Sequence, residues 1–113
     1  MDKNTFQRTV TDDTVFWVIL GSKHTIATID NVGGNRFALV FSTEKKARTF
    51  YEKARSKVDM YWNNAVVQKT WGEVVTMTMG KFRRHAFFHF DLSPKVDKID
   101  TNRIIYVEQN KEV

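Results

Sequence analysis

Cysteine is absent from this chain of 113 residues. Neither disulfide bonds nor thiolate metal ligands can therefore stabilise the fold, which suits a reducing compartment. Proline occurs only once, at position 94, and no internal repeat or low-complexity stretch divides the chain. Because this length fits one domain, we expect residues 1–113 to fold as a single unit.

Long apolar runs are also missing. The first eight residues have no apolar segment after their charges, unlike a secretory signal. No window approaches the roughly 18 apolar residues that a membrane-spanning helix needs. We therefore predict a cytoplasmic protein with no membrane partner.

Apolar surface and positive charge are both plentiful. Hydrophobic residues make up 42% of the chain, and nine Phe, three Trp and three Tyr supply large buried areas for a core. The formal net charge is +5. Such a balance favours acidic partners and speeds encounters with them, although it says nothing about the fold.

Three strands are predicted in the first third of the chain. Residues 15–20 are apolar at every position and rich in β-branched and aromatic types, as in a strand buried on both faces. Residues 24–30 and 36–41 have the composition of two further strands. The turn between them, 31–35, contains Gly and Asn, which tolerate positive φ. The close spacing predicts an antiparallel meander.

Helical periodicity follows the third strand. Ser42 or Thr43 can cap a helix, and apolar residues then recur at helical spacing, which predicts about five turns over residues 43–62. Residues 65–80 fit either strands or a helical arc. For this segment we favour a second, shorter helix that ends at Gly80.

The two ends of the chain are less regular. Phe6 and Val10 lie four residues apart, so residues 1–14 form either a short helix docked on the body or a frayed tail. Residues 103–107 have the pattern of a last short strand. Together with an aromatic strand over 85–92, these predictions define the fold class. It is α+β, with a mainly antiparallel sheet of about five strands packed by one long and one shorter helix.

The aromatic strand has two different faces. Ala86, Phe88, Phe90 and Leu92 alternate with a second set that contains Arg83, His85, Phe87 and His89. Cations that alternate with flat rings suit single-stranded nucleic acid, because the cations bind phosphates and the rings stack on bases. The competing interpretation is an amphipathic strand whose second face is covered by a helix or a partner chain.

The octet of residues 83–90 resembles the RNP1 motif of RNA-recognition motifs at Arg83, Ala86, Phe87 and Phe90. Arg84, however, occupies the glycine position of that motif. That family also has a helix directly after its first strand, whereas this chain has a turn and two more predicted strands.

The predicted long helix carries a basic stripe. It could contact phosphates, and each neutralised phosphate would add salt dependence to binding. The competing interpretation is a solvated outer face that keeps the protein soluble. The residues concerned are Lys45, Lys46, Arg48, Lys53 and Arg55.

No arrangement of residues predicts catalysis, a metal or a cofactor. His85 and His89 would lie about 13 Å apart on a strand at ~3.3 Å per residue, which is too far to share one ion. His89 and Asp91 share a face and could form an orienting pair for a general base. No nucleophile is marked beside them, so two exposed polar residues are the simpler interpretation.

One wider pattern has a family counterpart. A Trp-containing first strand (15–20) and a short second strand (24–29) precede the segment 37–44, FALVFSTE, which enters a helix marked by Ala47. This order resembles the opening of SseB-like N-terminal domains and related small bacterial proteins of unknown function. The resemblance implies a non-enzymatic α/β module and transfers no site residues. The proline frequent in that family's strand is absent here.

The leading functional hypothesis is a non-enzymatic binding or adaptor module with a basic surface and an acidic partner, either a protein or a nucleic acid. The first alternative is binding of RNA or single-stranded DNA through the basic-aromatic strand face. The second alternative is a self-associating structural protein, such as a homodimer, because aromatic faces and edge strands often form interfaces.

Overall fold

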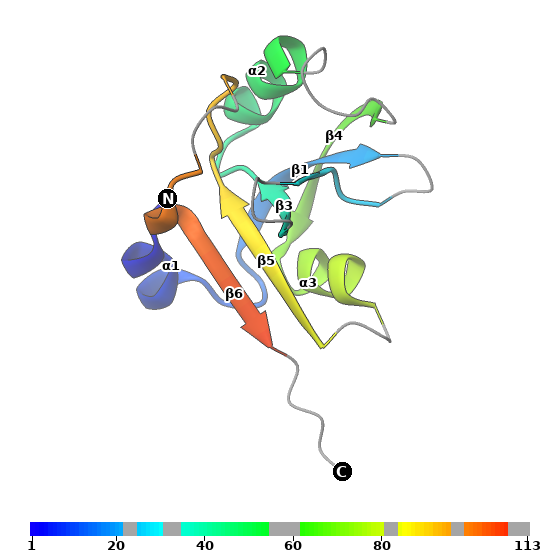
Figure 1. The fold of residues 1–113 in the computed structure, drawn as a ribbon. Helices are drawn as coiled ribbons and strands as arrows, with labels where there is room; N and C mark the ends of the chain where they lie inside the picture. Colours follow the sequence, from blue (N-terminus) through cyan, green and yellow to red (C-terminus); the bar gives the residue numbers. More distant parts are fainter. Residues whose placement is uncertain (22–24, 31–34, 55–61, 81–83, 96–98, 109–113) are drawn as a thin grey trace.

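The computed structural model describes residues 1–21, 25–30, 35–54, 62–80, 84–95 and 99–108. These residues form three α-helices, six strands and one short 3-10 helix (Figure 1). Their order is α1 (Lys3–Thr9), β1 (Val15–Gly21), β2 (Thr28–Asp30), β3 (Arg36–Val40), α2 (Glu44–Ala54), β4 (Trp62–Thr70), α3 (Trp71–Met79), β5 (His85–Phe90), the 3-10 helix Thr101–Arg103 and β6 (Ile104–Glu108). The predicted α+β class is confirmed.

The six strands form two sheets, so the prediction of one sheet of about five strands is wrong. β1 pairs with β4, and the other four strands follow the order β2-β3-β5-β6. Of the four strand pairs in the described residues, three are antiparallel, whereas β3 and β5 are parallel. The parallel pair needs a long crossover, which α2, β4 and α3 provide.

The predicted meander holds only for β2 and β3, which are antiparallel neighbours. β1 touches them through two isolated bridges, from Leu20 to Ile26 and from Trp17 to Phe41. Its main partner is β4, which pairs with it over its full length. Because β1 pairs with β4, it belongs to a two-stranded sheet and not to the predicted meander.

The segment 65–80 contains a strand and then a helix, so the prediction of one helix is wrong over residues 65–70. α3 begins only after Thr70, whose hydroxyl accepts a bond from the Glu73 backbone N–H while the Glu73 carboxylate accepts one from the Thr70 N–H. This capping box is visible in the sequence as Thr-x-x-Glu. The helix ends at Gly80, as predicted.

The structure describes the predicted long helix over Glu44–Ala54. α2 covers 11 residues and buries Ala47, Phe50 and Ala54 along one side. Residues 55–61 lie outside the described part of the chain, and Trp62 already belongs to β4. The predicted end of this helix at residue 62 is therefore wrong.

The amino-terminal segment forms the docked helix of the two alternatives. Asp2 caps α1 by accepting a bond from the Thr5 N–H. The Phe6 ring lies with its centroid 4.9 Å from that of Trp71 and 5.4 Å from that of Phe90. These ring contacts attach α1 to the core.

All five predicted strands have different ends in the structure. β1 extends one residue beyond the predicted 15–20, and β3 ends one residue before the predicted 41. The strand expected over 24–30 begins with residue 24, outside the described residues, and residues 25–30 form a regular strand only over Thr28–Asp30. The last strand runs over Ile104–Glu108, one residue later than the predicted 103–107. β5 ends at Phe90 rather than residue 92, because Asp91 has a φ of 51° and turns the chain before Pro94 is reached.

Apolar side chains form two core clusters. In the first, α1 and α3 pack on β1 and on one face of the four-stranded sheet, where Ala86, Phe88 and Phe90 of β5 lie. In the second, α2 packs on β1 and on residues that include Phe37 and Leu39 of β3, with Phe87 at the margin. The second face of β5 is therefore covered in part by its own chain.

The Thr70 cap gives a first prediction. Thr70→Ala should lower the free energy of unfolding by about 1 kcal/mol, because the amino-terminal N–H groups of α3 lose their side-chain acceptor. Thr76→Ala, at an exposed position of the same helix, serves as the control and should change it by less than about 0.5 kcal/mol. Urea unfolding would measure both, and equal effects would contradict the assigned cap.

Candidate functional site

The predicted basic-aromatic face of β5 changes from exposed to buried along the strand. His85 is exposed, Phe87 is half-buried and His89 is only 1% exposed. Arg83 lies outside the described residues. The structure therefore does not show one continuous open face over these four residues.

His89 is buried because the chain returns over it after β5. The backbone N–H of Asp100 donates to Nε2 of His89 at 3.0 Å, and Nδ1 lies 3.1 Å from the Phe90 carbonyl oxygen. Since Nε2 accepts, Nδ1 carries the proton and donates, which makes the ring neutral. Burial is the main cause that lowers the pKa of His89. This histidine therefore stabilises the fold.

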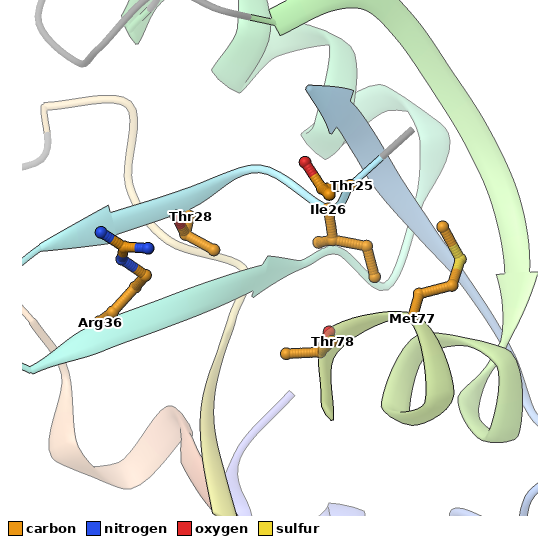
Figure 2. Close-up of a pocket in the computed structure, with 6 residues that line it drawn as sticks. All are labelled: Thr25, Ile26, Thr28, Arg36, Met77 and Thr78. Carbon is orange, nitrogen blue, oxygen red and sulfur yellow. The ribbon is translucent and has the colours of Figure 1, made fainter. Parts of the chain in front are cut away.

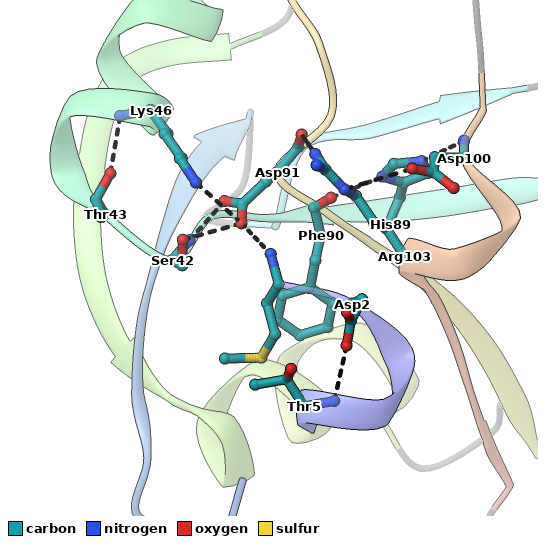
Figure 3. A network of polar contacts seen from close by, with 11 residues as sticks. Asp2, Thr5, Ser42, Thr43, Lys46, His89, Phe90, Asp91, Asp100 and Arg103 are labelled. Carbon is teal, nitrogen blue, oxygen red and sulfur yellow. Dashed lines mark hydrogen bonds and ion pairs between the residues drawn. The ribbon is translucent and has the colours of Figure 1, made fainter. Parts of the chain in front are cut away.

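Asp91 is the second buried polar residue, and it lies at the centre of the network in Figure 3. Its Oδ1 accepts from the Ser42 backbone N–H at 2.8 Å, and its Oδ2 accepts from the Ser42 hydroxyl at 2.9 Å. Oδ2 also binds the Met1 ammonium at 2.7 Å and lies 3.5 Å from Nζ of Lys46. Burial by itself raises the pKa of Asp91, but the bonds from Met1 and Ser42 outweigh it and hold that pKa below its usual value.

His89 and Asp91 do not form the orienting pair that was one of the two interpretations of the sequence. Both ring nitrogens of His89 are occupied by backbone groups, and both carboxylate oxygens of Asp91 are occupied by other donors. The prediction that these two residues are exposed is wrong, because the turn after β5 buries both. Their bonds hold the turn in place and leave neither group facing a substrate.

The exposed part of this face is a group of three rings, here called the aromatic patch: His85 and Phe87 of β5 and Tyr106 of β6. Tyr106 lies opposite Phe87 in the strand register and is 50% exposed. Its ring centroid is 5.1 Å from that of Phe87 and 5.9 Å from that of His85. The ring planes of Tyr106 and His85 form an angle of 30°. The patch therefore spans two neighbouring strands.

Sequence reasoning missed Tyr106. Its strand was predicted, but alternation within one strand says nothing about which neighbouring strand it faces. The pairing of β6 with β5 brings the tyrosine beside the two rings. Pairing is decided by tertiary structure, so no local signal could have identified this neighbour.

The basic stripe of α2 is exposed but lies away from the aromatic patch. Lys45, Lys46, Arg48 and Lys53 are all exposed, and Arg55 lies outside the described residues. Lys46 reaches Asp91, just past the end of β5, whereas His85 begins that strand. Six residues of strand span roughly 20 Å. The structure therefore does not bring the stripe and the rings into one compact site.

The described residues contain neither a metal-binding cluster nor a membrane-spanning helix. Among them, no group of three or more His, Cys, Asp or Glu side chains is placed to hold a metal ion. No helix in the described ranges combines the length and apolar character needed to cross a membrane.

Comparison of the chain with protein-family models, with curated proteins and with solved structures finds no match. The resemblance to SseB-like domains therefore stays a prediction from the sequence.

The Asp91 network gives a second prediction. Asp91→Asn keeps a side chain that tolerates positive φ but removes the charge that neutralises Met1 and Lys46. We expect a loss of about 2 kcal/mol in the free energy of unfolding, since a buried charged acceptor is replaced by a neutral amide. Asp100→Asn, at an exposed ion pair with Arg103, should cost less than about 0.5 kcal/mol in the same urea titration.

His89 gives a third prediction, on pH dependence. The pKa of His89 in the folded protein lies below its ordinary value of 6.5. As the pH falls, the unfolded chain therefore binds a proton at this residue at a higher pH than the folded protein does. The contribution of His89 to stability should therefore be constant above pH 6.5 and fall as the pH drops below it, by up to about 1.4 kcal/mol per pH unit.

His89→Gln should weaken this pH dependence, because the titrating ring is removed. His85→Gln, at the exposed end of the same strand, should retain it. Chemical unfolding between about pH 8 and about pH 5 separates this effect from the titration of carboxylates. A slope that persists unchanged in His89→Gln would contradict the assignment.

Proposed function

We propose that this chain is a non-enzymatic binding module that receives an extended segment of a partner protein along β6, beside the aromatic patch. The observation that carries the proposal is the position of Tyr106. Its large aromatic ring is 50% exposed, and it stands on an edge strand. Rings in such positions often supply the central contacts of protein interfaces.

The edge position of β6 explains the mode of binding. β6 follows β5 at the end of the four-stranded sheet, and β5 is its one partner strand in the described part of the chain. A strand with one partner presents N–H and C=O groups on its other side, which an added strand can pair with. The opposite edge, β2, has only three residues, compared with five in β6.

The charges near the rings favour a protein over a nucleic acid. On the face of β5 and β6 that carries the patch, the described residues include Glu108, opposite His85, and no lysine or arginine. A strand of nucleic acid needs cations beside its stacking rings. The exposed cations of α2 lie beyond the far end of β5. The net charge of +5 favours a partner with acidic residues outside the ring contacts.

The absence of enzymatic activity is part of the proposal. The two buried polar residues nearest to a catalytic arrangement, His89 and Asp91, are both bonded within the protein. A general base has to reach a substrate proton with a free lone pair. These contacts support a structural role for both residues.

A fourth prediction tests the contact surface. Random peptides displayed on phage and selected on the protein should include binders that shift the amide resonances of residues 104–108 in NMR titrations. Tyr106→Ala should weaken these peptides at least about tenfold, since a central ring contact is lost. Val15→Ala, at the other strongly exposed large hydrophobic residue, should leave their affinity unchanged.

Other outcomes would favour the rival functions. Tight binding of a fluorescein-labelled oligouridine at low salt, lost in Tyr106→Ala, would overturn the protein-partner proposal in favour of RNA. A dimer in sedimentation that dissociates in Tyr106→Ala would show that the occupant of β6 is a second copy of the chain. Peptides that shift α2 instead of β6 would place the binding surface on the basic helix.

A further inference from the structure

A pocket of about 290 Å³ lies between α3 and the strands β2 and β3 (Figure 2). Its wall is made by Thr25, Ile26, Thr28, Arg36, Met77 and Thr78. Ile26 and Met77 pack in the first core cluster, whereas Phe87 of the aromatic patch packs against the second. The pocket is therefore separate from the proposed protein-binding surface.

The lining combines one cation, hydroxyl groups and an apolar wall. Arg36 supplies a guanidinium, Thr25 and Thr28 supply hydroxyls, and Ile26 and Met77 supply the apolar part. Arg36 and Thr25 also have partners within the protein. A guanidinium has five N–H donors, so Arg36 can keep such a partner and still bind an oxyanion.

Thr78 provides a second, independent observation. Its hydroxyl oxygen is buried and has no hydrogen-bond partner among the described residues, although the residue lines the pocket. Threonine in a helix populates two side-chain rotamers. A change of rotamer would move the hydroxyl to another side of the residue, where a bound ligand could satisfy it. A bound ligand would favour this exchange, because an unsatisfied buried donor is unfavourable.

The electrostatics of α3 limit the charge of the ligand. Met77 and Thr78 lie in the last turn of α3, which carries no basic residue. The carboxyl end of a helix has a partial negative charge. It therefore repels a ligand with two negative charges more strongly than a ligand with one. A singly charged carboxylate bound at Arg36 is therefore favoured over a dianionic phosphate.

We propose that this pocket binds a short aliphatic carboxylate. The carboxylate lies against the Arg36 guanidinium and accepts from the threonine hydroxyls, and the hydrocarbon chain lies against Ile26 and Met77. The volume lies at the lower end of the range of small-molecule sites, so a short carboxylate fits within it. Thr78 turns its hydroxyl toward the bound molecule.

The fifth prediction is tested with sodium butyrate as the probe, in NMR titrations of the intact protein. Butyrate should cause saturable shifts at residues 25–28, 36, 77 and 78 in the millimolar range. Acetate should bind more weakly because it lacks the chain, and inorganic phosphate should not compete. Shifts that do not saturate, or that map elsewhere, would overturn the proposal. Phosphate that binds as tightly as butyrate would overturn the carboxylate class.

Two variants complete the experiment. Arg36→Gln should weaken butyrate at least tenfold, whereas Arg84→Gln, at an exposed arginine outside the lining, should leave it unchanged. Thr78→Val should raise the Tm of the free protein, because the unpaired hydroxyl is removed, and should weaken butyrate severalfold. Since this variant is expected to be more stable, its loss of binding cannot be a folding defect. Unchanged butyrate affinity in both Arg36→Gln and Thr78→Val would exclude the pocket as the site.

Discussion

The carboxylate of Asp91 and the turn that it occupies are joined to three parts of the chain that are distant from one another in sequence: Met1, residues 40–42 and Arg103. The carboxylate oxygens of Asp91 accept from the Met1 ammonium, before α1, and from Ser42, which leads into α2. The backbone carbonyl oxygen of Asp91 accepts from Arg103, just before β6. The N–H of Asp91 donates to Val40 at the end of β3. The buried charge needs its partners Met1 and Ser42, because desolvation would otherwise favour the neutral form of the carboxyl group. The ends of β3, β5 and α2 are therefore held at one point.

The two ends of β5 have different roles, because the polar side chains at its carboxyl end are bonded within the protein and the His85 ring at its amino end is exposed. The bonds of His89 and Asp91 are internal, so the buried end of the strand is structural. At the opposite end, His85 and Tyr106 are exposed, and β6 has no second neighbour among the described strands. The same strand thus contributes both to the stability of the core and to the proposed contact surface. The basic residues of α2 lie near the structural end, which explains why positive charge and exposed rings do not form one site.

The two proposed binding regions use different physical resources. The aromatic patch offers ring surface and an open strand edge, which suit an extended partner. The pocket beside α3 offers a guanidinium, threonine hydroxyls and a small apolar wall, which suit a small molecule. Because they adjoin different core clusters, either can be altered by substitution without removing the other.

Local patterns in the sequence were sufficient for much of the secondary structure. The apolar run of β1, the alternation in β5 and the start of α2 follow from side-chain periodicity, which depends only on neighbouring residues. The capping box at Thr70 and Glu73 was also present as a local signal and marks where β4 gives way to α3. The prediction of one helix across 65–80 used the helical spacing of the apolar residues and not this signal.

The sequence by itself determined an α+β chain with an amphipathic aromatic strand, because composition and period are local properties. Only the tertiary structure decided that β1 pairs with β4, that β5 lies parallel to β3 and that Tyr106 stands beside Phe87. It also decided that His89 is buried, through a bond from Asp100, 11 residues further along the chain. These outcomes depend on which distant segments meet, and the free energy of those contacts is not encoded in any short stretch of residues.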